Sequence, residues 1–192
     1  MLQTRAVAVF MMVAITFCVA QEVMAIGPVV VPYSEFAVIA PDTGSMKPRV
    51  LLTFHLPDAL SDVEIDDAHL RFSARVDVPL FVPTGQTLLR CSAISTAWAP
   101  STVGWDFPWD SPGGVLDEAS LRNAVVARGE HTEVRIRVAD ILQHWIDSPS
   151  RNFGLAVACA DGVPGGLWVS LPGEGSRRDM PSIEIHYSLR DR

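Results

Sequence analysis

Residues 68–77, AHLRFSARVD, alternate strictly between apolar and polar side chains. Ala68, Leu70, Phe72 and the next two apolar residues share one parity, and polar or charged residues occupy the other. Because successive side chains of a strand point to opposite faces of a sheet, this period of two predicts a β-strand with one buried and one solvated face.

The same pattern recurs along the chain and predicts an all-β protein. Residues 134–138 and 183–187 alternate in the same way. More continuous apolar runs predict strands nearer the middle of a sheet, at residues 50–56, 88–94, 153–160 and 167–171. Segments rich in Pro and Gly separate the runs, at residues 41–44, 83–85, 111–114, 162–166 and 172–175. Seven or more short strands predict a β-sandwich.

Helical patterns are scarce. Residues 138–145, VADILQHW, place Val138, Ile141, Leu142 and Trp145 on one face at helical spacing. Residues 116–126 could form another short turn or helix. We expect one or two short helices that pack across a sheet end.

The first 25 residues have the composition of a signal peptide. Arg5 supplies a positive start, and the uncharged run at residues 6–20 has the length of a signal-peptide core rather than of a bilayer span. Small residues allow cleavage after Ala25, which we favour, or after Ala20. The alternative to a signal peptide is an N-terminal anchor helix that is not removed. Phe17 before Cys18 argues against a lipid-modified cysteine. We therefore expect a secreted or cell-envelope protein with one domain at residues 26–192.

The chain is acidic, with 15 Lys and Arg against 22 Asp and Glu and a net charge of -7. Removal of residues 1–25 takes away one positive and one negative charge and leaves this balance unchanged. Such a chain has no electrostatic footprint for nucleic acid or anionic lipid. We expect no nucleic-acid partner, and no membrane partner once the signal peptide is removed.

The segment after the expected cleavage site keeps two cysteines, Cys91 and Cys159, both in strand-like runs. In an oxidising compartment they could form a disulfide that stabilises the fold by roughly 3 to 5 kcal/mol. The alternative is a pair of buried thiols that pack as small apolar groups. The sequence leaves both interpretations open.

Five blocks of sequence carry a family resemblance. They are residues 50–57 (VLLTFHLP), 65–72 (IDDAHLRF), 97–106 (AWAPSTVGWD), 138–145 with 151–155 (VADILQHW, RNFGL), and 181–187 (PSIEIHY). In this order they resemble the DNRLRE family, whose secreted β-sandwich domains overlap with alginate-binding carbohydrate-binding modules. The resemblance runs from Arg49 to Tyr187, and the stretch before Arg49 lacks the family's N-terminal strand motif. It implies a jelly-roll-like antiparallel β-sandwich. It also implies structural roles for Trp98, Trp105, Trp145, Asn152 and Gly154.

The loop at residues 104–110, GWDFPWD, is a candidate sugar site. Phe107 and Trp109 alternate with Asp106 and Asp110 around Pro108. An aromatic ring covers the apolar face of a sugar and a carboxylate accepts its hydroxyl hydrogen bonds. We expect these four residues to face a ligand.

An acidic polymer such as alginate would need a basic surface instead. Arg71, Arg75, Arg135 and Arg137 lie on the polar faces of two alternating strands and would form such a surface if those strands are neighbours. The alternative is an ordinary solvated sheet face.

No sequence motif indicates an enzyme or a cofactor. Asp62, Glu64, Asp66 and Asp67 suggest calcium, but their spacing fits no EF-hand loop and a solvated turn is favoured, so we expect no metal. The histidines show no paired ligand spacing, and there is no G-x-S-x-G or phosphate-binding glycine motif. The sequence does not exclude a glycosidase with two catalytic carboxylates far apart in the chain, since such a pair is recognised by its geometry and not by its spacing.

These observations favour a secreted, non-catalytic carbohydrate-binding or surface-adhesion module. Its expected partner is an extracellular polysaccharide or a cell-surface component. The alternative is a purely structural protein of the cell exterior or envelope that has no sugar site.

Overall fold

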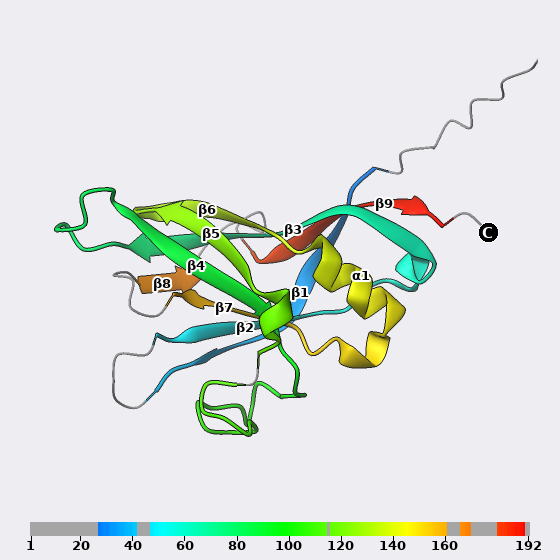
Figure 1. Ribbon diagram of the computed structural model, residues 1–192, viewed down its shortest axis with the longest axis horizontal. Helices are drawn as coiled ribbons and strands as arrows, with labels where there is room; N and C mark the ends of the chain where they lie inside the picture. Colours follow the sequence, from blue (N-terminus) through cyan, green and yellow to red (C-terminus); the bar gives the residue numbers. More distant parts are fainter. Residues whose placement is uncertain (1–26, 42–46, 115, 161–165, 170–179, 191–192) are drawn as a thin grey trace, which may run out of the picture.

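The computed structural model describes residues 27–41, 47–114, 116–160, 166–169 and 180–190 (Figure 1). The expected signal peptide and its cleavage sites lie outside the described residues. So do most of the turns expected at residues 41–44, 162–166 and 172–175.

The described residues form an antiparallel sheet, which confirms the all-β prediction. The strands are β1 (Val29–Ile39), β2 (Arg49–Phe54), β3 (Val63–Asp77), β4 (Gln86–Ala93), β5 (Arg122–Ala127), β6 (Gly129–Arg137), β7 (Leu155–Cys159), β8 (Gly166–Val169) and β9 (Ser182–Leu189). Their order is β5-β4-β7-β2-β1-β9-β3-β6, and β8 pairs with β3. The expected runs at 50–56, 88–94 and 153–160 became the interior strands β2, β4 and β7.

Strand β1 joins the two halves of the fold, so the strands make one continuous sheet rather than two separate ones. Residues 29–32 pair with β9, and residues from Tyr33 onward pair with β2. A register shift between Tyr33 and Glu35 follows Pro32, which has no backbone N–H to donate. The main core combines residues of both halves, among them Leu52, Leu89, Leu70 and Ile136.

The expected helix is present as α1 (Ala139–Asp147). Its apolar side chains Ile141, Leu142 and Trp145 are buried in the main core, which explains why the helical spacing was readable in the sequence. The element expected at residues 116–126 is a 3-10 turn, η2 (Glu118–Ser120), followed by strand β5. None of the helices in the described part of the chain is long and apolar enough to span a membrane.

Two strands had no clear signal in the sequence. Strand β5 lies at one end of the strand order and only its Val126 is buried, so its sequence shows weak alternation. Strand β1 changes partners along its length, and the apolar residues it buries do not follow a single parity. Short turns complete the described fold, η1 (Asp58–Leu60) before β3 and η3 (Pro149–Arg151) after α1.

Asn152 and Gly154 join η3 to β7, as expected of structural residues. The Nδ2 of Asn152 donates a hydrogen bond of 2.9 Å to the carbonyl oxygen of Phe54, the last residue of β2. Gly154 has a φ of +94° and lies directly against the backbone of Leu52. Both residues therefore fix the approach of β7 to β2.

Candidate functional site

The loop between β4 and η2 folds back over the outer face of β2 and β7, the face opposite the main core. A second apolar cluster forms there around Ile39, Leu51, Ile94, Trp109 and Ala156. The loop adds half-buried side chains to it, namely Trp98, Val103, Trp105 and Leu116. The loop is therefore a packed layer of the fold.

Trp109 is a residue of this cluster, which corrects the expectation that its ring faces a sugar. It is only 7% exposed, and its Nε1 donates a hydrogen bond of 2.8 Å to the carbonyl oxygen of Gly104. Gly114 lies against the ring, where even a Cβ atom would be 3.3 Å from it. No face of the indole is left for stacking on a ligand.

The other three residues of the predicted sugar site are exposed. Phe107 is 60% exposed, and Asp106 and Asp110 are also on the surface. The predicted alternation fails at Trp109 because the chain turns at Pro108 and brings the indole back onto the sheet. Phe107, Asp106 and Asp110 therefore remain at the surface of this loop, but the second aromatic ring expected beside them, that of Trp109, is buried.

Trp98 and Trp105 are half-buried and take part in the packing of the loop. The Nε1 of Trp98 donates a hydrogen bond of 2.8 Å to the carbonyl oxygen of Phe153. The guanidinium carbon of Arg49 lies 5.3 Å from the centroid of a Trp105 ring, a cation–π contact. Both rings thus attach the loop to the strands beneath it.

The four predicted arginines do lie on neighbouring strands, since β3 pairs with β6 and Arg71 lies opposite Arg135. Each of them is paired with a carboxylate. Arg71 binds Glu184 and Glu133, Arg135 lies near Glu184, Arg75 binds Asp77 and Arg137 binds Asp67. This face is therefore a set of ion pairs and supplies no net basic surface.

The contact between Arg71 and Glu184 shifts the pKa of both groups. The hydrogen bond from Arg71 lowers the pKa of Glu184, and the same bond raises the pKa of Arg71. Glu184 is the most enclosed of these carboxylates, with a side chain that is 16% exposed. At neutral pH the charges on this face offset each other, which favours the alternative of an ordinary solvated sheet face.

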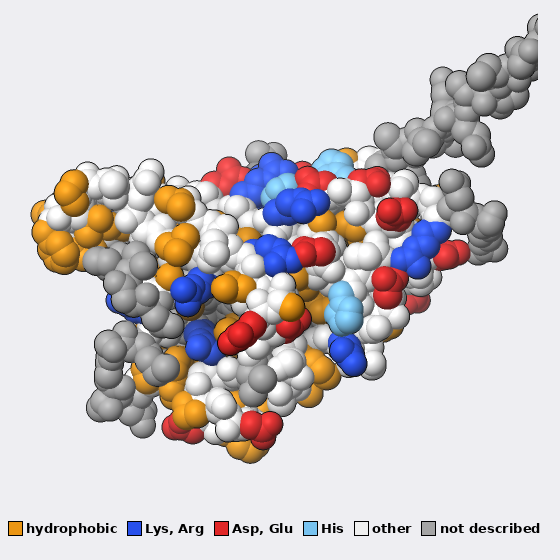
Figure 2. Space-filling model, viewed as in Figure 1, with side chains coloured by type: hydrophobic (Ala, Val, Ile, Leu, Met, Phe, Trp, Pro, Cys, Tyr) orange, Lys and Arg blue, Asp and Glu red, His pale blue; other side chains and the backbone are white. Residues whose placement is uncertain are grey.

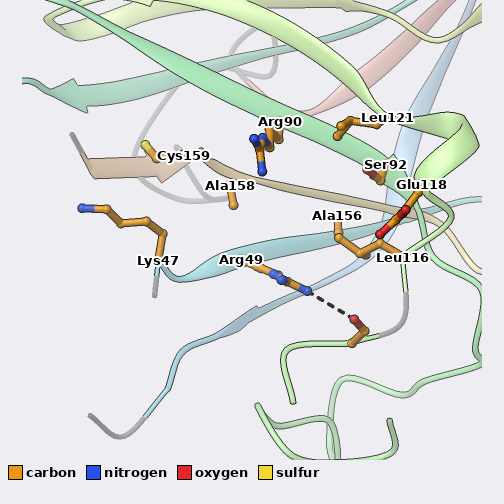
Figure 3. A pocket seen from close by; sticks show the side chains of 11 residues that line it. Lys47, Arg49, Arg90, Ser92, Leu116, Glu118, Leu121, Ala156, Ala158 and Cys159 are labelled. Carbon is orange, nitrogen blue, oxygen red and sulfur yellow. Dashed lines mark hydrogen bonds between the residues drawn. The ribbon is translucent and has the colours of Figure 1, made fainter. Parts of the chain in front are cut away.

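A different basic site lies on the outer face of β2, β7 and β4 (Figure 3). The register places Arg49 of β2 and Arg90 of β4 on opposite sides of Ala158 of β7. Leu51 and Ser92 flank Ala156 in the same way one row further along. The small side chains of Ala156 and Ala158 leave a channel between β2 and β4. The backbones of these two strands are on the order of 10 Å apart, twice the strand spacing.

This channel is a groove of about 440 Å³, which we call the β7 groove. Residues of the loop between β4 and η2, and of η2 itself, close one side of the groove. The groove is lined by Lys47, Arg49, Arg90, Ser92, Gly114, Leu116, Glu118, Leu121, Ala156, Ala158 and Cys159. Three cations and a single carboxylate, Glu118, lie among these residues, so the groove is locally basic on an acidic protein.

Arg49 is held in place before any ligand arrives. Its Nη1 donates hydrogen bonds to the carbonyl oxygens of Gly113 and Gly114, the latter at 3.3 Å, while the guanidinium lies over Trp105. Arg90 is exposed on the other side of Ala158. One fixed and one exposed guanidinium thus face the same channel, an arrangement suited to carboxylate or sulfate groups.

The two cysteines are buried thiols in this structure and are not bonded to each other. Cys91 lies opposite Val157 and Cys159 lies opposite Leu89, so the thiols are diagonal neighbours on the core face of β4 and β7. Burial raises the pKa of Cys91 to about 12, and burial also raises the pKa of Cys159. The interpretation as small packed apolar groups fits this arrangement.

We therefore expect neither thiol to react in the folded protein. Residues 26–192 should give almost no colour with a thiol reagent in native, mildly alkaline buffer, because the reactive thiolate is scarce and inaccessible. After denaturation in guanidinium chloride the same sample should give two thiols per chain. A sample that gives none after denaturation contains a disulfide and contradicts this expectation.

The acidic residues near the start of β3 point to different partners. Asp67 pairs with Arg137 and with His69, whereas Asp66 accepts a hydrogen bond from Ser188. Among the described residues, no group of three or more His, Cys, Asp or Glu side chains is placed to hold a metal ion. The acidic cluster is part of the surface ion pairing of the sheet.

Comparison with family models and with curated proteins identified no relative of this chain. The resemblance to the DNRLRE family therefore stays a hypothesis that rests on the quoted segments.

Few features of the sequence indicated the β7 groove. Arg90 is the one charged residue in the apolar run 88–94, and its parity opposite to Leu89 and Cys91 placed it on the outer face. Nothing local places it across from Arg49, because β4 and β2 are separated by β3 in the chain and meet only through β7. The groove forms because the strand order places β7 between β4 and β2.

Proposed function

We propose that this protein is a secreted, non-catalytic module that binds an acidic polysaccharide in the β7 groove. The observation that carries the proposal is the row Arg49–Ala158–Arg90, with Lys47 at the same groove and Glu118 as the single carboxylate of its lining. Guanidinium groups on both sides of a channel can bind successive carboxylates of a polyuronate chain.

Two further features support a polymer of sugars over a small anion. The lining of the groove includes apolar surface from Ala156, Leu116 and Leu121. Such surface suits the C–H faces of sugar rings, while the arginines take the acidic groups. The signal-peptide composition of residues 1–25 and the resemblance to the DNRLRE family support an extracellular ligand.

The non-catalytic part of the proposal rests on the groove itself. Hydrolysis of a glycosidic bond by the usual route needs two carboxyl groups on either side of that bond. Glu118 is the single Asp or Glu among the described residues that line the groove. Binding without cleavage is the activity this arrangement supports best.

Replacement of Arg90 by alanine tests the proposal. Loss of one charge-assisted hydrogen bond is worth about 1.5–3 kcal/mol, so affinity for alginate should fall about tenfold to a hundredfold. Arg90 is exposed, and the variant should fold normally. The measurement is affinity electrophoresis in gels that contain alginate, with thermal unfolding of each variant as the check on folding.

Arg151→Ala is the matched control, because Arg151 is exposed and does not line the groove. It removes the same charge and should leave retardation nearly unchanged. Equal losses in both variants would mean that net charge alone drives the interaction, and this outcome would refute the groove as the site. No retardation of the wild type on any polysaccharide would favour the purely structural alternative.

A further inference from the structure

The outer face of β7 is most accessible at a single position. Three alanines share the parity of that face, namely Ala156, Ala158 and Ala160, the last of which extends the pairing with β4. Ala156 is 3% exposed and Ala160 is 1% exposed, whereas Ala158 is only half-buried. The β7 groove is therefore most open over Ala158.

A row of directly paired residues crosses the sheet at this position. Arg49 of β2 and Arg90 of β4 lie opposite Ala158 on its two sides, and Asn123 of β5 lies opposite Arg90. Paired residues of neighbouring antiparallel strands point to the same face, so all four side chains lie on the outer face. We call these four residues the cross-strand row. It spans three strand spacings, about 14 Å. Figure 2 shows Lys and Arg side chains at the surface over the part of the sheet that contains β7 and β2.

The two ends of the cross-strand row differ. On the β1 side, Ile39 lies opposite Arg49 and is 2% exposed, because it packs under the loop between β4 and η2. At the other end, Asn123 is exposed, and β5 is the last strand in the order. Asn123 lies beyond the residues that line the β7 groove. The row is thus closed beside Arg49 and open at β5.

A ligand that lay along the strands would meet the loop between β4 and η2. This loop contacts the sheet through a bridge between Ile94 and Leu116, just beyond Ser92. The backbone N–H of Asp117 also donates a hydrogen bond of 3.0 Å to the carbonyl oxygen of Ala93. These contacts close the groove in the strand direction at this end. A ligand that crosses the strands instead follows the row toward β5, away from the loop.

We propose that an extended acidic polysaccharide lies across the strands over the cross-strand row, with Asn123 as a further binding residue, an inference that rests on the function proposed above. One pyranose unit is about as long as one strand spacing, so Arg49 and Arg90, two spacings apart, meet the acidic groups of every second sugar. In a ribbon-like chain these are the successive acidic groups that face the protein. The sugar between them lies over Ala158. The amide of Asn123 can donate and accept hydrogen bonds with the hydroxyl groups of the sugar beyond Arg90.

Two matched charge additions distinguish this direction from the strand direction. Asn123→Arg adds a cation at the open end of the row. Gln86→Arg adds the same charge on the same face, about 13 Å from Arg90 along β4. Both native side chains are exposed, so both variants should fold normally. Each variant is titrated with an alginate tetrasaccharide by calorimetry at 0.15 M ionic strength, beside the wild type, Asn123→Ala and Arg90→Ala, and thermal unfolding of each protein checks its folding.

Asn123→Arg should raise the affinity roughly twofold to tenfold, the effect of one exposed charged contact. Asn123→Ala should lower the affinity by a similar factor, the effect of one lost hydrogen bond. Gln86→Arg should leave the affinity within about twofold of the wild type, because its charge lies more than a Debye length of about 8 Å from the row.

The outcomes separate this inference from the function on which it rests. If Arg90→Ala weakens binding while both Asn123 variants match the wild type, the groove is the site and the cross-strand direction is wrong. An increase with Gln86→Arg as large as that with Asn123→Arg also overturns the direction. If the wild type does not bind, or if Arg90→Ala binds equally well, the proposed function fails and this inference fails with it.

Discussion

Replacement of Gly154 by alanine should destabilise the protein by about 2–5 kcal/mol, which combines left-handed backbone strain with overpacking. A Cβ atom at this position would lie 2.2 Å from the carbonyl oxygen of Leu52 and 3.0 Å from its carbonyl carbon. Both atoms belong to the backbone of β2, so no side chain can move aside. The φ of +94° adds strain for any residue with a side chain.

The loss is large because total stability of a domain is only about 5–15 kcal/mol. Urea unfolding followed by tryptophan fluorescence should show the midpoint fall by a large fraction, and the variant should express poorly. Gly104→Ala is the control, since Gly104 has no positive φ and nothing lies within 4 Å of an added Cβ atom. Equal stability of the two variants would contradict the close approach of β7 to β2.

Replacement of Trp145 by alanine should cost about 3–5 kcal/mol, the range for a large buried aromatic ring. Trp145 is 1% exposed and lies in the main core, where it attaches α1 to the folded sheet. Differential scanning calorimetry should show a much lower midpoint of unfolding.

Phe81→Ala is the matched control for Trp145, because it also removes an aromatic ring but from a side chain that is 78% exposed. It should change stability by less than about 0.5 kcal/mol. A small effect at Trp145 would mean that α1 does not close the core. A large effect at Phe81 would mean that the β3–β4 loop packs against the fold.

The sequence predicted strands best where one face of a strand is buried and the other is wet. Residues 68–77 fall inside β3, and Ala68, Leu70 and Phe72 are buried as their parity required. The helix α1 was readable for the same reason, since a single face carries its apolar residues. Strands β1 and β5 were not predicted. Strand β1 changes pairing partner along its length, and strand β5 buries only one side chain.

The candidate site was harder to predict because its residues meet only after the strands are ordered. The polar parity of Arg71 and Arg135 correctly placed them on the outside of β3 and β6. One of the carboxylates that neutralise them, Glu184, comes from β9. No local sequence pattern predicts that β9 lies beside β3. The prediction for Trp109 was wrong in the opposite sense. Its loop was expected to be exposed, but it folds back onto β2 and β7 and buries the ring.

The most direct test of acidic-polysaccharide binding in the β7 groove is affinity electrophoresis of wild-type residues 26–192 against alginate, pectin and a neutral glucan, each at low and high salt. We expect retardation on the acidic polymers, none on the neutral one, a loss of retardation as salt rises, and no release of oligosaccharides. Retardation on the neutral glucan that persists at high salt, or no retardation on any polymer, would contradict arginine-led binding in this groove.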